Sequence, residues 1–175
     1  MRSKLTALLL AGLLGFSPAL FGRGTYLEPA QFVAESFAFH PPQPRVLYLR
    51  GEVKQTVQSI LGHRFPGLRI RYWMQDTRTA WILDEVGKER PITVGIVVDQ
   101  GHIERVRILV FRESRGDEVR HPFFTEQFRG AGTGPEYRLD RHIDNIAGAT
   151  LSVRAVRKLV RLALYLDQVV HRDAT

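Results

Sequence analysis

The residues best suited to chemistry lie in one short segment near the C-terminus, residues 144–152. Thr150 carries a hydroxyl, directly follows the small residues Gly148 and Ala149, and stands at the entrance to a long stretch of helical periodicity. The first N–H groups of a helix have no partner inside it, and the helix dipole is positive at that end, so a phosphate brought there is stabilised. A simpler interpretation stays open, in which Thr150 or Ser152 caps the helix and Gly148 lets the chain turn into it.

Other chemistries lack the residues that they need. The chain has no cysteine, which excludes disulfides, thiolate catalysis and Cys-bound metals. Its six histidines stand singly, with no pair one helical turn apart, so we expect no metal site. Residues 130–134 are rich in glycine, but no strand precedes them and Pro135 follows, which predicts a flexible loop and not a dinucleotide site. The sequence holds no Gly-x-Ser-x-Gly motif, and we assign no catalytic residue.

The longest predicted element is a helix over residues 152–171, which has to position the segment before it. Its apolar residues recur at helical spacing and form one face, which comprises Val153, Val156, Leu159, Val160, Ala163, Leu166 and Val170. Alternating apolar residues at 92–98 and 106–110 predict two antiparallel strands joined by a turn at 99–102.

Shorter elements complete the predicted fold. Strands are expected at 68–73 and 79–83, and helices from Pro29 and over residues 52–61, the second ending at Gly62. The resulting fold class is α+β: a single domain whose antiparallel sheet is packed by a long C-terminal helix, with an N-terminal helical extension.

The N-terminus has the pattern of a secretory signal. Arg2 and Lys4 precede an uncharged apolar run at residues 5–16, and the Ser-Pro-Ala at 17–19 offers small residues for cleavage. We predict a signal peptide over residues 1–19 and an exported protein; an uncleaved anchor is the alternative, because a slightly longer run reaches the minimum of about 17 residues that spans a bilayer. Export and the scattered arginines argue against nucleic acid as the partner of a chain with a net charge of +7, and favour solubility or attraction to anionic head groups.

The motif Asp144-x-x-x-Gly148-Ala149-Thr150-Leu151-Ser152 resembles the flavinylation motif of FMN-binding domains, as in peripheral subunits of Na⁺-translocating quinone reductases and Rnf-type complexes. Three upstream segments are similar to further elements of that family: the turn at 99–103 (Asp-x-Gly-His-Ile), the loop Glu113-Ser114-Arg115-Gly116, and the segment at 124–130 (Phe-Thr-Glu-Gln-Phe-Arg-Gly). The resemblance covers about residues 87–168. It departs at Ala147, where the family's motif usually has Ser or Thr.

The resemblance implies that a flavin transferase moves FMN from FAD onto Thr150, where the FMN is held covalently through its phosphate. The other residues that it implies for cofactor binding are Asp144, Gly148, Ala149, Leu151, Ser152, Glu113 and Ser114. The hypothesis that follows is an exported electron-transfer flavoprotein, in the periplasm or on the outer face of the inner membrane, which exchanges electrons with a membrane redox partner.

This hypothesis divides the chain into an unassigned N-terminal extension, residues 20–86, and an FMN-binding domain, residues 87–175. The alternative is an exported, non-redox binding or interaction module in which residues 148–152 are only a helix cap.

Four basic residues follow one another along the predicted C-terminal helix: Arg154, Arg157, Lys158 and Arg161. They either face a partner or form the solvated polar side of the helix.

Overall fold

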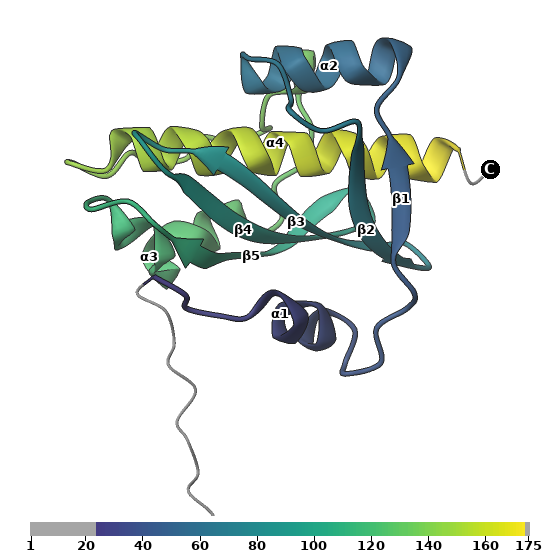
Figure 1. Cartoon of the computed structure of the whole chain (residues 1–175), viewed down its shortest axis with the longest axis horizontal. Helices are drawn as coiled ribbons and strands as arrows, with labels where there is room; N and C mark the ends of the chain where they lie inside the picture. The colour runs from purple at the N-terminus through teal and green to yellow at the C-terminus, as the bar shows by residue number, and fades with distance from the viewer. Residues whose placement is uncertain (1–23, 174–175) are drawn as a thin grey trace, which may run out of the picture.

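A five-stranded antiparallel sheet forms the centre of the molecule, which we describe from a computed structural model over residues 24–173. The predicted signal segment lies outside these residues. The strands follow each other across the sheet in chain order (Figure 1), as β1 (Arg45–Tyr48), β2 (Arg69–Gln75), β3 (Arg78–Val86), β4 (Pro91–Asp99) and β5 (His102–Phe111). The two halves of the chain therefore share one sheet, because β3 pairs along its whole length with β4.

Helices cover both faces of this sheet (Figure 1). The α-helices are α1 (Pro29–Ser36), α2 (Gly51–Leu61), α3 (Pro122–Thr125) and α4 (Thr150–Arg172), and three short 3₁₀ helices span Asp117–Arg120, Glu126–Phe128 and Pro135–Tyr137. The predicted α+β fold, with its long C-terminal helix and short N-terminal helices, is confirmed. Within the described residues, no helix combines the length and the apolar character needed to cross a membrane.

The predicted hairpin is β4 and β5, joined at Gln100 and Gly101. Both of these turn residues have positive φ, 51° and 76°, which matches the right-handed twist of the strands they connect. The strand pair Asp99 and His102 closes the turn. Strand β4 is almost entirely buried, because Ile92, Val94, Ile96 and Val98 lie in the core under α4 while Gly95 and Val97 lie under α1.

Helix α4 packs on one face of the sheet through the apolar residues that the sequence predicted for this contact. Leu159, Ala163 and Leu166 are all at most 1% exposed, and they belong to the same cluster as Trp81 of β3. Two buried hydrogen bonds in series also link α4 to β3. The Trp81 Nε1–H donates to the Thr79 hydroxyl at 2.8 Å, and that hydroxyl donates to Asp167 of α4 at 2.6 Å. Burial raises the pKa of the Asp167 carboxyl.

Helix α1 packs on the opposite face over β3, β4 and β5. Its Phe32 lies directly on Gly95 of β4, where a Cβ atom would stand only 2.7 Å from the ring. Gly95 is therefore the residue that lets α1 approach the sheet, and Ala80, Val97 and Leu109 complete this smaller core.

Shortening a side chain at the centre of α4 tests the packing of the helix on the sheet. Leu159→Ala should lower the free energy of unfolding by about 2–5 kcal/mol, because it leaves a cavity under a side chain that is 1% exposed. The same change at Leu68, which is 70% exposed, should cost less than about 0.5 kcal/mol. Urea unfolding of both variants measures the difference, and equal costs would contradict the described packing of α4.

Candidate functional site

Helix α4 begins at Thr150, two residues earlier than predicted, and its first turn has no side-chain cap. Ala149 occupies the N-cap position, so neither Thr150 nor Ser152 plays the capping role that the simpler interpretation gave them. The N–H groups of this first turn thus have neither intrahelical partners nor a capping oxygen. Thr150 is exposed, and its hydroxyl accepts a hydrogen bond from Asn145 Nδ2 at 3.0 Å.

The loop after β5 docks against this helix start. Gly116 has a φ of 90°, and a Cβ atom added to it would lie 2.5 Å from Ser152 Oγ and 3.6 Å from Ala149 Cα. Only glycine adopts this backbone freely and leaves room for such an approach. The glycine that ends the Glu-Ser-x-Gly segment therefore has a packing role that the sequence pattern alone did not assign.

Glu113, at the start of the same loop, organises a second loop. Its Oε1 accepts hydrogen bonds from the backbone N–H groups of Lys88, Glu89 and Arg90, at 2.5, 2.7 and 2.9 Å. Partial burial opposes ionisation of Glu113, but these three donors and the Lys88 ammonium together place its pKa below the ordinary value. Glu113 is thus ionised at neutral pH and holds the β3–β4 connection beside the start of α4.

These two loops and the helix start line an open hollow of about 630 Å³. The residues that line it are Lys88, Glu113, Ser114, Arg115, Gly148, Ala149, Thr150, Leu151 and Ser152. Seven of the eight residues predicted for cofactor binding are therefore brought together, although they lie in two segments far apart in the sequence. Sequence reasoning missed Lys88 and Arg115; Lys88 belongs to the β3–β4 connection, whose N–H groups bind Glu113.

Asp144 is the predicted residue that does not line the hollow. Its side chain is 78% exposed, with one carboxylate oxygen 3.5 Å from His142 Nε2. Its backbone N–H donates to Gln127 Oε1 at 2.8 Å. This contact joins the segment before α4 to the aromatic segment at 124–130, so two parts of the recognised pattern touch through the backbone of Asp144.

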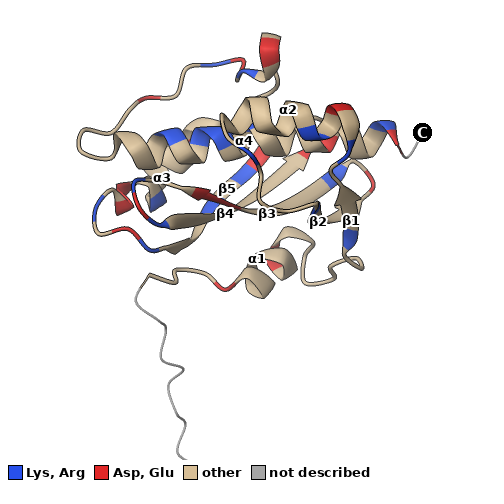
Figure 2. Ribbon diagram, turned by 45° about the horizontal axis from the view of Figure 1, so that its top comes forward, with Lys and Arg blue, Asp and Glu red and all other residues tan. Residues whose placement is uncertain are grey.

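Thr150 also borders a second hollow, a groove of about 460 Å³ between α2 and α4. All four residues of the predicted basic stripe line this groove, together with residues 59–62 at the end of α2. Figure 2 shows the basic positions recurring along α4. Thr150 thus stands between the hollow lined by its own motif and a basic groove.

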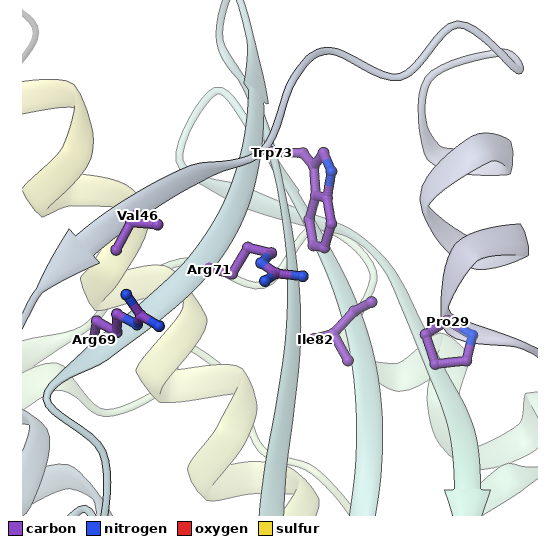
Figure 3. Close-up of a pocket in the computed structure, with 6 residues that line it drawn as sticks. All are labelled: Pro29, Val46, Arg69, Arg71, Trp73 and Ile82. Carbon is purple, nitrogen blue, oxygen red and sulfur yellow. The ribbon is translucent and has the colours of Figure 1, made fainter.

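A third hollow lies on the opposite face of the sheet, beside α1 (Figure 3). It has a volume of about 450 Å³ and is lined by Pro29, Val46, Arg69, Arg71, Trp73 and Ile82. None of these residues belongs to the 144–152 segment or to the loops around it.

Comparison with known proteins identifies the part of the chain that builds the first hollow. Residues 87–165 match the family model described as FMN-binding domain. This match confirms the resemblance inferred from the motifs. The chain has no match among curated proteins and none among solved structures.

Substituting Gly116 tests the docking of the loop. Gly116→Ala should cost about 1–3 kcal/mol in backbone strain, and a further 1 kcal/mol or so because the new methyl group displaces Ser152. Gly62→Ala is the matched control, since Gly62 also has positive φ but nothing lies within 4 Å of its Cβ position. Unfolding experiments that give equal losses for the two variants would show that the loop does not depend on this close approach.

The charge of Glu113 should make stability depend on pH. Its pKa is lowered in the folded protein, so its contribution is complete above the ordinary value of 4.5 and is lost as pH falls through the lower, folded-state pKa. Glu113→Gln should therefore cost about 1–3 kcal/mol at pH 7 and progressively less below pH 4.5. Glu28→Gln, at an exposed residue without a capping bond, is the control and should change the free energy of unfolding at pH 7 by less than about 0.5 kcal/mol.

Proposed function

We propose that the protein, whose residues 87–165 match the FMN-binding domain family, is an exported electron carrier that holds FMN through a phosphoester to Thr150. The observation that carries the proposal is the position of one hydroxyl. Thr150 is exposed and is the first residue of the longest helix. It borders a hollow that is lined by residues 148–152 of its own motif and by residues 113–115 of the loop after β5.

The surroundings of Thr150 fit an esterified phosphate, which keeps a negative charge. The uncapped first turn of α4 offers N–H groups and the positive end of the helix dipole. Lys88 and Arg115 line the same hollow and add positive charge. Ala149 and Gly148 leave the approach to the backbone open, because one has only a methyl group and the other has no side chain.

Attachment requires a reaction that we assign to a second protein, a flavin transferase. The proposed flavin transferase forms a bond between Thr150 Oγ1 and the FMN phosphorus of FAD, breaks the pyrophosphate, and releases AMP, which takes the hydroxyl proton. The exposure of Thr150 leaves this oxygen accessible to such an enzyme. The hydrogen bond from Asn145 Nδ2 holds the same oxygen in a defined direction before the reaction.

Bound FMN supplies the ability to take up and release one or two electrons. The chain's own task is then to hold the flavin, orient it and set its surroundings. Covalent attachment would keep the cofactor on a protein outside the cytoplasm, where free FMN would diffuse away. We include export in the proposal on the strength of the basic and apolar N-terminal pattern, and a membrane redox partner on the strength of the family resemblance.

Mass spectrometry of the exported protein, coexpressed with a flavin transferase, tests the attachment. The peptide that contains Thr150 should gain the mass of FMN less one water, and absorbance near 450 nm should survive denaturation. Thr150→Ala should abolish both signals, whereas Thr150→Ser and Ser152→Ala should keep them because a hydroxyl remains at position 150. The intact mass also reads the N-terminus, which should lie near Leu20 if the signal is cleaved.

A control protein of the family, flavinylated under the same conditions, makes a negative result decisive. If the control is fully modified and this chain is not, attachment at Thr150 is wrong and the interpretation as a non-redox module takes its place. Modification on a different residue would retain the flavoprotein and reject the site.

A further inference from the structure

The basic stripe of α4 begins at Thr150 itself. Positions 150, 154, 157, 158 and 161 are separated by three or four residues, or by one, so they follow one side of the helix. At 1.5 Å of rise per residue, Arg154 and Arg161 stand about 6 and 17 Å along the axis from Thr150. All of them line the groove between α2 and α4.

The charges in this groove are not balanced. Lys158 is paired with Glu85, at 3.1 Å, and this buried carboxylate also accepts a hydrogen bond from His63. Arg154 and Arg157 are exposed and have no ion-pair partner within residues 24–173, and no carboxylate lines the groove. An excess of positive charge therefore remains next to Thr150.

Arg161 is partly buried and lies near two other positively charged side chains. Its Nε–H donates to the Tyr137 carbonyl at 2.7 Å, which fixes the guanidinium in a partly buried place. Burial and the nearby charges of Arg138 and Arg157 lower the pKa of Arg161. A negatively charged group in the groove would relieve this repulsion.

We propose that the groove between α2 and α4 docks an acidic protein surface, whose redox centre exchanges electrons with the flavin on Thr150. The electron-exchange part of this proposal rests on the proposed function, but the docking part does not. The groove is continuous with Thr150, so a partner seated in it comes close to any group carried on that oxygen. Acidic side chains on a protruding surface match both the charge and the recessed shape of the groove.

An anionic membrane is the less suitable partner for this surface. A helix that binds a membrane surface inserts an apolar face beside its basic one, and the apolar face of α4 is buried against the sheet. Leu151 is the one large apolar side chain of α4 that is substantially exposed within the described chain. A flat lipid surface would also fail to reach Lys158, which is 27% exposed, and the partly buried Arg161.

Two double variants with the same net charge distinguish docking in the groove from a general effect of charge on binding. Arg154→Glu with Arg157→Glu removes the excess charge of the groove, and Arg69→Glu with Arg71→Glu makes the same change in net charge on the other face of the sheet (Figure 3). All four arginines are exposed, so both variants should unfold like the original chain in urea. This check precedes the binding measurements.

The first measurement uses the chain without flavin and a soluble, acidic cytochrome b as the partner. Calorimetry at low salt should show binding that weakens with added salt. The groove reversal should weaken it about tenfold or more, while the reversal at Arg69 and Arg71 should change it less than about twofold. Equal losses in the two variants, or no loss in either, would overturn the docking proposal.

The second measurement uses the flavinylated chain, reduced and mixed with the same cytochrome or with basic cytochrome c. The groove reversal should slow electron transfer to the acidic acceptor about tenfold and speed transfer to the basic one. If binding changes as expected but transfer does not, the groove docks proteins without serving the flavin, and the electron-exchange part is wrong. Absence of flavin on Thr150 is a failure of the proposed function, which mass spectrometry reads separately and which leaves the binding result standing.

Vesicles of phosphatidylglycerol test an anionic membrane as the alternative partner of the groove. If the groove reversal abolishes vesicle binding and leaves cytochrome binding unchanged, the surface serves a membrane and the proposal is overturned. Retention of vesicle binding together with loss of cytochrome binding supports it.

Discussion

The burial of one face of α4 against the sheet is the contact on which the other features depend. Leu159, Ala163 and Leu166 are almost completely removed from water, and burial of each large aliphatic side chain contributes about 1.5–3 kcal/mol. This packing fixes where α4 starts as well as where it runs. Thr150 therefore has its place set by a rigid, 23-residue helix and not by the loop that precedes it.

The rotation of α4 about its axis matters as much as its position. The apolar face and the basic stripe are on different sides of the same helix, so the angle at which the apolar face packs determines where the stripe points. The buried bond between Thr79 and Asp167 near the C-terminal end favours one such angle, because another would move the Thr79 hydroxyl away from a buried carboxylate. A polar contact far from Thr150 thus helps to set the direction in which the basic stripe of α4 faces.

The sequence predicted the elements that have strong periodicity and missed the contacts that join them. The β4–β5 hairpin and α4 were clear from apolar spacing. Strand β1 was not predicted, because it has four residues at the edge of the sheet and only one of them, Leu47, is buried. The three N–H groups held by Glu113 could not be inferred either, since they come from a loop 23 to 25 residues earlier in the chain and become neighbours only through the β3–β4–β5 meander.

Thr150 borders both the hollow and the groove, and these two surfaces are built from different parts of the chain. Its motif and the Glu113 loop form one side, entirely within residues 87–165. The other side needs the first half of the chain, because α2 forms a wall of the groove and Glu85 of β3 neutralises Lys158. If FMN is held at Thr150, attachment depends on the family pattern alone, while the surface presented to a partner depends on a part of the chain that has no recognised motif. The same attachment chemistry could then serve different partners, because substitutions in α2 and on the outer side of α4 would alter the groove without touching the residues that hold the cofactor.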